Sequence, residues 1–265
     1  MEDTVIQTGS AGRQGPLWGA RAAAWAGNEE RQVPTFELGI DRLGLAQGDE
    51  VLDIGCGTGV FLGLAGDRGA RVHGLDASEA LAELARERVP GADVRVGDME
   101  SLPFEDDRFD VVTGFNSFFF AADMPAALRE AGRVAKPGGA VLIQVWGAPE
   151  RCDLSALREA VAPLGPPRPA AADAPPLWQP GVLEGMATDA GLAPGQSFDH
   201  SYAFEYPDRE TLLRLMLSPG VVVAAIDVSG EDRVRDAIAA ALEPFRTADG
   251  GYRLENEWHY LIATA

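Results

Sequence analysis

Two hydrophobic patterns alternate along the chain from residue 50 onward. Short runs rich in β-branched and aromatic residues are separated by longer segments in which apolar residues recur every three or four positions. The five runs are Glu50–Ile54, Arg71–Leu75, Val94–Val96, Phe109–Thr113 and Val141–Trp146. Strands that alternate with helices are typical of a parallel sheet with helices on both faces. The pattern therefore predicts a doubly wound α/β fold.

Two of the intervening segments begin at residues suited to cap a helix. Ser78 precedes a segment with Leu81 and Leu84 on one face, and Asp123 precedes another that carries Leu128. Side-chain oxygens of Ser and Asp accept hydrogen bonds from the free N–H groups of the first helical turn. Both segments are predicted to be helices that connect parallel strands.

The second half of the chain predicts helices inserted before a last pair of strands. A Pro- and Ala-rich stretch at Pro163–Pro180 suits neither a helix nor a central strand. The elements predicted beyond it are a helix at Val182–Ala190, a strand at Phe198–Tyr206, helices at Asp208–Leu217 and Glu231–Phe245, the second capped by Ser229, and a final strand at Arg253–Thr264. We expect residues 208–245 to form a helical insertion over the sheet.

The first 47 residues differ from the rest. Residues 1–15 are polar and Gly-rich and are predicted to be a flexible tail, followed by a helical cap over 16–47. Trp18 and Trp25 are seven residues apart, so they would share one face of a single helix. We expect one domain over 16–265, with a core at 48–147 and a substrate-side half at 148–265.

Charge and cysteine content exclude several classes of partner. The 265 residues include 22 Lys and Arg against 41 Asp and Glu, a net charge of -19 that would repel nucleic acid and anionic membranes. The two cysteines, Cys56 and Cys152, have no partners at metal-ligand spacing. No apolar run suits a signal peptide or a membrane span. The sequence therefore predicts a cytoplasmic protein without nucleic-acid or membrane partners.

The segment Val51-Leu-Asp-Ile-Gly-Cys-Gly-Thr-Gly-Val-Phe61 carries the strongest chemical signal. A buried strand runs into three alternating glycines and then into a helix, as required where the backbone approaches a ligand closely. A dinucleotide fingerprint needs a third glycine where Val60 stands. The spacing therefore disfavours a phosphate-binding loop.

This loop, with Asp53 before it, resembles motif I of the class I S-adenosylmethionine-dependent methyltransferases. Three further resemblances follow in order: Asp76 after the second strand, Gly97-Asp98-Met99 after the third, and Phe109–Asn116 along the fourth. Arg133–Gly139 then matches the turn into the fifth strand. The resemblance covers about residues 48–147. It implies a Rossmann-like, mostly parallel seven-stranded sheet with an antiparallel last strand.

The resemblance also implies roles at the cofactor, S-adenosyl-L-methionine, whose product is S-adenosyl-L-homocysteine. Asp76 would accept hydrogen bonds from the ribose hydroxyls and Asp98 one from the adenine amino group. Asp53 would orient the glycine loop. Ligands of such sheets lie at the carboxyl ends of strands, where all three aspartates fall. The residues expected at the cofactor are Trp25, Asp53, Gly55, Gly57, Asp76, Ala77, Asp98, Met99, Phe115 and Asn116.

The expected methyl acceptor is a small molecule. Relatives that methylate nucleic-acid amines or protein amides carry Asn/Asp-Pro-Pro-Tyr/Phe after the fourth strand, where this chain has Asn116-Ser-Phe-Phe119. The likeness is to the ubiquinone/menaquinone-biosynthesis-like branch, which is frequent in bacterial secondary metabolism. General-base candidates are His200, Tyr202 and His259, each of which also suits an ordinary strand position. No metal is predicted, and the protein would be a monomer or a homodimer.

Two alternatives stay open at this point. A protein of the same fold could bind S-adenosyl-L-methionine without transferring its methyl group, as a non-catalytic or cyclase-like protein. A nicotinamide-dependent oxidoreductase would instead bind NAD(H), which Val60 disfavours. Whether the methyl group goes to O, N or C is also open.

Overall fold

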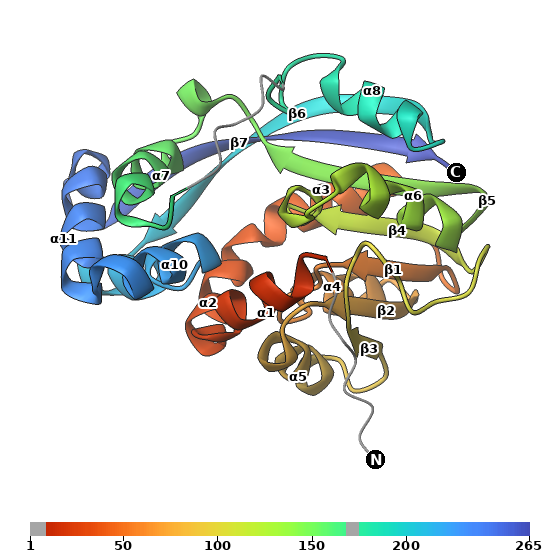
Figure 1. Ribbon diagram of the computed structural model, residues 1–265, viewed down its shortest axis with the longest axis horizontal. Helices are drawn as coiled ribbons and strands as arrows, with labels where there is room; N and C mark the ends of the chain where they lie inside the picture. Colours follow the sequence, from red (N-terminus) through yellow and green to blue (C-terminus); the bar gives the residue numbers. More distant parts are fainter. Residues whose placement is uncertain (1–8, 168–174) are drawn as a thin grey trace.

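A seven-stranded sheet forms the centre of the molecule (Figure 1). The computed structural model describes residues 9–167 and 175–265. The strand order is β3-β2-β1-β4-β5-β7-β6, in which β7 runs antiparallel to both β5 and β6. The strands are β1 (Glu50–Ile54), β2 (Arg71–Asp76), β3 (Asp93–Val96), β4 (Phe109–Phe115), β5 (Ala135–Trp146), β6 (Ala193–Tyr206) and β7 (Tyr252–Thr264). The predicted Rossmann-like fold with an antiparallel last strand is confirmed.

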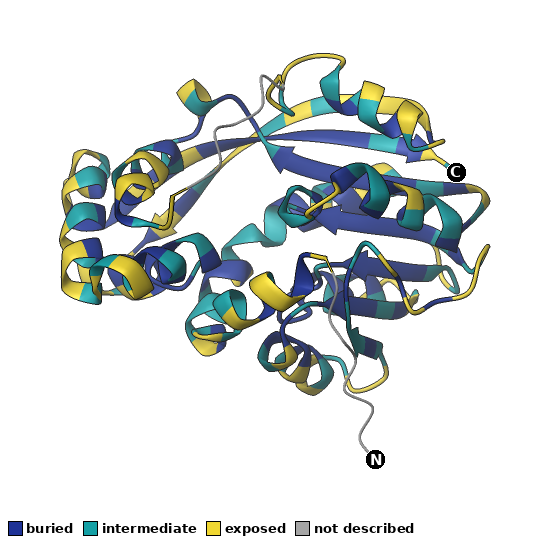
Figure 2. Cartoon of the chain, in the orientation of Figure 1, coloured by how far each residue is buried: buried dark blue, intermediate teal, exposed yellow. Residues whose placement is uncertain are grey.

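Helices cover both faces of the sheet, and their apolar sides form two cores. They are α1 (Ala11–Gly19), α2 (Ala22–Glu29), α3 (Val33–Leu43), α4 (Val60–Asp67), α5 (Glu79–Arg88), α6 (Met124–Val134), α7 (Leu154–Val161), α8 (Val182–Asp189), α9 (Arg209–Met216), α10 (Gly220–Ser229) and α11 (Glu231–Leu242). Phe36 of α3 and Phe61 of α4 belong to one core, and Leu128 of α6 and Leu183 of α8 to the other. Figure 2 shows the buried strands between these layers.

The predicted helix caps on α5 and α6 are present. Ser78 Oγ accepts a hydrogen bond from the Leu81 N–H at 3.3 Å, and Asp123 Oδ1 accepts one from the Ala126 N–H at 3.0 Å. Both caps lie where a strand or loop turns into a helix, so local sequence was sufficient to predict where these helices begin.

The N-terminal helices differ in detail from the prediction. Helix α1 begins at Ala11, inside the segment predicted to be a tail, because the Ala11 N–H donates to Asp98 Oδ2 at 3.0 Å and ties the helix to the sheet. Trp18 lies on α1 and Trp25 on α2, not on one helix, since the backbone at Arg21 leaves the helical conformation. Their rings still meet edge to face, with centroids 4.7 Å apart. Residues 1–8 lie outside the described residues.

Helices α7, α10 and α11 gather at one end of the long ribbon formed by β6 and β7 (Figure 1). The segment Gly220–Ser229 is a helix that the sequence pattern missed, because its run of Val residues lacks a polar face. Ser229 ends α10 and donates from Oγ to the Leu164 carbonyl, so it does not cap α11 as predicted; Gly230 takes that position. Of the predicted connection at 163–180, residues 168–174 lie outside the described residues.

Within the described chain, no single helix has the length and hydropathy needed to cross a bilayer. Helices α9 and α10 meet that test only as a pair, across a bend of 87°.

Candidate active site

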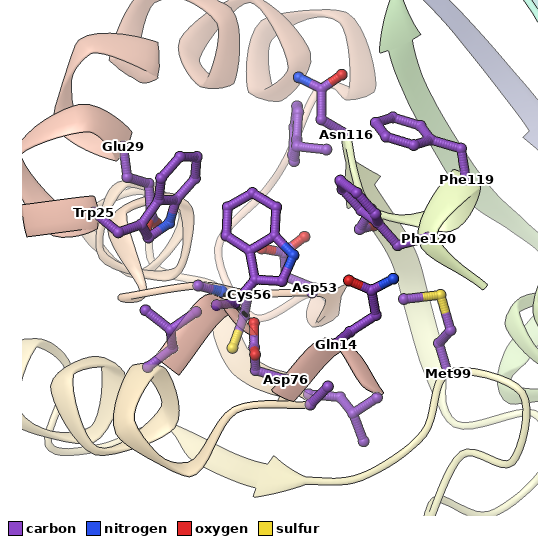
Figure 3. Close-up of a pocket in the computed structure, with 18 of the residues that line it drawn as sticks. Gln14, Trp25, Glu29, Asp53, Cys56, Asp76, Met99, Asn116, Phe119 and Phe120 are labelled. Carbon is purple, nitrogen blue, oxygen red and sulfur yellow. Dashed lines mark hydrogen bonds between the residues drawn. The ribbon is translucent and has the colours of Figure 1, made fainter. Parts of the chain in front are cut away.

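A cavity opens where β1, β2 and β4 end at the same edge of the sheet. Its walls come from the glycine loop, from the turns after β2, β3 and β4, and from α1, α2 and α3 (Figure 3). Nine of the ten residues expected at the cofactor line it: Trp25, Asp53, Gly55, Gly57, Asp76, Ala77, Met99, Phe115 and Asn116. The carboxyl ends of parallel strands are the usual ligand site of such sheets.

The glycine loop needs glycine for both conformation and space. Gly55 and Gly57 have φ of 79° and 55°, a region that L-residues with side chains rarely adopt. A Cβ on Gly55 would lie 2.5 Å from Ser117 Cβ, and one on Gly57 would lie 2.5 Å from Glu29 Oε2. The loop therefore passes between β4 and α2 with its bare backbone.

Two predicted aspartates lie beside this loop, and one of them hydrogen-bonds to it. Asp76 Oδ2 accepts from the Gly57 N–H at 2.9 Å, and its Oδ1 accepts from the Ser78 N–H at 2.8 Å. Asp53 Oδ1 accepts from Thr113 Oγ1 at 2.7 Å. Both carboxylates are buried and line the cavity, so each keeps lone pairs for a ligand, and Asp76 also positions the loop.

Glu29 is a cavity residue that the sequence did not reveal. It ends α2, and its carboxylate accepts from the backbone N–H groups of Thr58 at 2.8 Å and Val60 at 3.3 Å. These N–H groups begin α4, where a helix otherwise attracts phosphate. A side-chain carboxylate thus occupies the anion site, a second reason, beside Val60, why the loop does not suit a dinucleotide. No motif marks Glu29, since it reaches the loop from about 30 residues away.

Three buried carboxylates therefore face one another around the loop. Burial raises the pKa of Asp76 to about 6, that of Glu29 to about 7 and that of Asp53 to about 8. Repulsion from the neighbouring carboxylates adds to the rise at Glu29 and Asp53. No arginine or lysine lines this cavity in the described part of the chain. A cationic group placed here would be strongly favoured.

Asp98 is the expected cofactor residue that does not line the cavity. Its two oxygens accept from the N–H groups of Ala11 and Glu100, whereas the residues on either side, Gly97 and Met99, do line the cavity. The carboxylate anchors the first turn of α1, and its contact with an adenine amino group stays a prediction.

Asn116 and Ser117 leave polar atoms without partners at the floor of the cavity. Asn116 has φ of 52°, and neither its Oδ1 nor its Nδ2 hydrogen-bonds to a described residue. Ser117 Oγ is also buried and has no hydrogen-bond partner among the described residues. Buried polar atoms normally have partners, and a strained residue is often kept for function. These atoms suit a polar ligand lying in the cavity.

The predicted general bases lie elsewhere. His200, Tyr202 and His259 are on β6 and β7, and none of them lines this cavity. His259 Nδ1 instead lies 2.7 Å from Asp199 Oδ1, and Tyr202 is 38% exposed. These three residues were predicted from the alternation of side chains along the strands, and that alternation does not show how far a residue lies from the cavity.

Comparisons with known proteins show which proteins this chain is similar to. Residues 52–143 match the family described as a methyltransferase domain. This segment is similar to the class I methyltransferases. The same similarity indicates that S-adenosyl-L-methionine is the methyl donor.

The relatives of this chain include named methyltransferases. The malonyl-[acyl-carrier protein] O-methyltransferase of Serratia marcescens is 37% identical over 101 residues, 38% of this chain and 40% of that protein. The demethylmenaquinone methyltransferase of Renibacterium salmoninarum is 35% identical over 112 residues, 42% and 47% of the two chains. The match thus spans less than half of either curated relative.

The fold extends beyond the matched segment. A putative methyltransferase from Bacillus halodurans C-125 superposes with a TM-score of 0.58 at 19% identity, over 86% of this chain and 97% of that one. The shared architecture thus includes the late strands as well as the cofactor motifs.

The cavity of the methyltransferase domain fits this donor. The bare glycine backbone would leave room for the methionine part, and Asp53 and Glu29, when ionised, would supply negative charge for its ammonium group. Asp76 offers acceptors for a ribose diol, while Leu75 and Met99 give an apolar wall for a purine. In the described residues, no group of three or more His, Cys, Asp or Glu side chains is arranged to hold a metal. That the reaction needs no metal stays a prediction.

Proposed function

We propose that the protein is an S-adenosyl-L-methionine-dependent methyltransferase that moves a methyl group to an O, N or C atom of a small molecule. The observation that carries the proposal is the cavity at the ends of β1, β2 and β4, with buried Asp53 and Asp76 and the unpartnered amide of Asn116. The family match covers the same strand ends.

The chain's contribution to the reaction is binding and positioning. When bound, the sulfonium group of the cofactor supplies an activated methyl and a neutral thioether leaving group. Asp76 would hold the ribose, Asp53 and Glu29 would neutralise the ammonium, and the aromatic walls would exclude water. Placing two reactants in line can supply up to about 7–11 kcal/mol of the barrier, so no strong general base is required.

Small molecules are favoured as acceptors for two reasons. The segment after β4 reads Asn116-Ser117-Phe118-Phe119, without the prolines of nucleic-acid and protein amide methyltransferases, and Phe119 lines the cavity. The charge of -19 opposes binding of nucleic acid. A place in the ubiquinone/menaquinone-like branch and in bacterial secondary metabolism is part of the same proposal.

The first experiment measures cofactor binding and methyl transfer separately. Calorimetry with S-adenosyl-L-homocysteine tests the cavity, and incubation with methyl-labelled S-adenosyl-L-methionine and fractionated bacterial extract tests transfer. We expect label in the small-molecule fraction, where mass spectrometry identifies the acceptor, and none with the Asp76→Ala variant at limiting cofactor. Label in RNA or polypeptide would overturn the small-molecule part of the proposal.

The same experiment separates the alternatives. A non-catalytic or cyclase-like protein would bind the cofactor and yield no labelled product in any fraction. A nicotinamide enzyme would bind NAD(H) and not S-adenosyl-L-homocysteine. The carboxylate of Glu29 at the start of α4 disfavours NAD(H), because it would repel the pyrophosphate.

A further inference from the structure

A second cavity adjoins the first. It has a volume of about 430 Å³ and lies between α1, α2, the end of β5 and the helices α7, α9 and α10. Both cavities are bounded by the same aromatic side chains, Trp18, Trp25, Phe119, Phe120 and Trp146. Gln14 and Gln32 also line both cavities, so a molecule in the second cavity would lie next to the cofactor in the first. Its size is within the usual range for small-molecule sites.

Most of the second cavity is apolar. Leu157 and Val161 of α7, Phe204 of β6, Met216 of α9 and Val221 of α10 form its far wall. Such walls are stabilised by an apolar ligand, because each square ångström of apolar surface removed from water contributes about 25 cal/mol. The occupant therefore needs a substantial hydrocarbon or aromatic body.

The charged groups of the second cavity are all positive. Arg13 of α1 and Arg158 of α7 line it, and no Asp, Glu, His, Lys or Tyr does so in the described chain. Neither arginine forms an ion pair with a described residue; Arg158 Nη2 donates only to Ser155 Oγ, at 3.3 Å. Both arginines are exposed, and no described carboxylate lines the cavity beside them, so they give this end of the cavity a positive charge.

Taking the proposed function as its basis, we propose that the second cavity holds the methyl acceptor and that this acceptor is an amphiphilic organic acid. Its apolar body packs against Leu157, Phe204 and Met216. Its anionic group lies beside Arg13 and Arg158, whose guanidinium groups form charge-assisted hydrogen bonds with a carboxylate, sulfonate or phosphate.

Other ligand classes fit this cavity less well. A cationic amine would be repelled by both arginines and would find no carboxylate among the lining residues. A neutral lipid would occupy the apolar wall and leave the positive charge without a counter-ion. The first cavity, with three carboxylates and no lysine or arginine among its described lining residues, has the opposite charge, so the acid and the cationic cofactor would take adjoining cavities.

The test uses three probes that share one chain length and differ in charge: decanoate, 1-decanol and decyltrimethylammonium. Their binding is followed by calorimetry on the full chain saturated with S-adenosyl-L-homocysteine, at concentrations below their micellar range. We expect decanoate to bind at least tenfold more tightly than the other two. Equal binding of decanol, or tighter binding of the cation, would overturn the proposal.

Variants connect the preference to the cavity. The double variant Arg13→Gln/Arg158→Gln should remove the preference for decanoate, while Arg233→Gln, an exposed arginine of α11 outside both cavities, should keep it. Ala224→Phe fills the cavity from α10 and should weaken decanoate binding at least tenfold with S-adenosyl-L-homocysteine binding intact. A preference that survives the double variant would place the acid elsewhere and contradict the proposal.

Failure of this inference is distinguishable from failure of the proposed function. Without S-adenosyl-L-homocysteine binding, the methyltransferase proposal itself fails. With that binding intact but no preference for the acid, only the acceptor class is wrong.

Discussion

The two cavities differ in where their walls come from and in the sign of their charge. The first is built from strand ends and the glycine loop and holds Glu29, Asp53 and Asp76; the second is built mainly from helices and holds Arg13 and Arg158. The carboxyl ends of neighbouring parallel strands lie at one edge of the sheet. The functional residues of the first cavity therefore fall in short sequence motifs that directly follow the strands. The helices that line the second cavity are α1 and α2 near the N-terminus and α7, α9 and α10 in the second half of the chain, and no sequence motif identifies them.

The largest expected effect comes from closing the space in the glycine loop. Gly55→Ala places a Cβ 2.5 Å from Ser117 Cβ at φ of 79°, so we expect cofactor affinity to fall at least 100-fold by calorimetry. Gly181→Ala is the matched control, because Gly181 has φ of 84° but nothing within 4 Å of its Cβ. Equal loss in both variants would mean that backbone strain, not contact with the site, is responsible.

Removal of one carboxylate from the first cavity should have the next largest effect. Asp76→Ala loses its hydrogen bonds to Gly57 and Ser78 and the acceptors for the ribose. A charge-assisted hydrogen bond contributes about 1.5–3 kcal/mol. At about 1.4 kcal/mol per tenfold, the dissociation constant for S-adenosyl-L-homocysteine should rise about 10- to 100-fold.

The control for Asp76 is Asp208→Ala. Asp208 also accepts a backbone N–H, from Thr211, but lies outside the first cavity. Its removal should leave the dissociation constant unchanged, and an unchanged constant in Asp76→Ala as well would exclude Asp76 from the site.

The carboxylates of the first cavity should also make cofactor affinity depend on pH. Their pKa values are raised to about 6, 7 and 8, so they carry protons at low pH and must lose them to bind a cationic ligand. Affinity should therefore rise with pH from about 5.5 to 8.5, by up to about tenfold per unit for each proton released. Calorimetry in buffers of different ionisation enthalpy measures the protons directly.

The same raised pKa values set the pH dependence of stability without ligand. In the folded state these groups bind protons more tightly than in the unfolded state, so the free energy of unfolding should fall as pH rises from about 4.5 to 8. Asp53→Asn keeps the acceptor for Thr113 and removes one charge, which should flatten the upper part of both pH profiles. A profile unchanged in this variant would show that Asp53 does not titrate there.

The smallest effect is expected on β6 and β7. His200, Tyr202 and His259 line neither cavity. Changing His200 to Gln, Tyr202 to Phe or His259 to Gln should therefore alter the rate of methyl transfer less than about threefold, which is small beside the 10²–10⁴-fold contribution of a general base. A loss of a hundredfold in one variant with an unchanged Kd for the cofactor would restore that residue as a base.

Prediction from the sequence succeeded for local features such as helix caps, and for residues that directly follow neighbouring strands of the sheet. The caps at Ser78 and Asp123 and the carboxylates of Asp53 and Asp76 were all predicted from adjacent residues. It missed helix α10, whose apolar run has no helical period, and the hydrogen bond that joins the Asp98 carboxylate to α1.

The sequence by itself determined the sheet, the glycine loop and the order of the strand-end aspartates, because hydrophobic periodicity and glycine spacing act over a few residues. Only the tertiary structure decided that Glu29 occupies the start of α4 and that Arg13 and Arg158 share a cavity. Whether residues 29 to 145 positions apart come together depends on how helices pack over the sheet, and a single sequence does not specify that packing residue by residue.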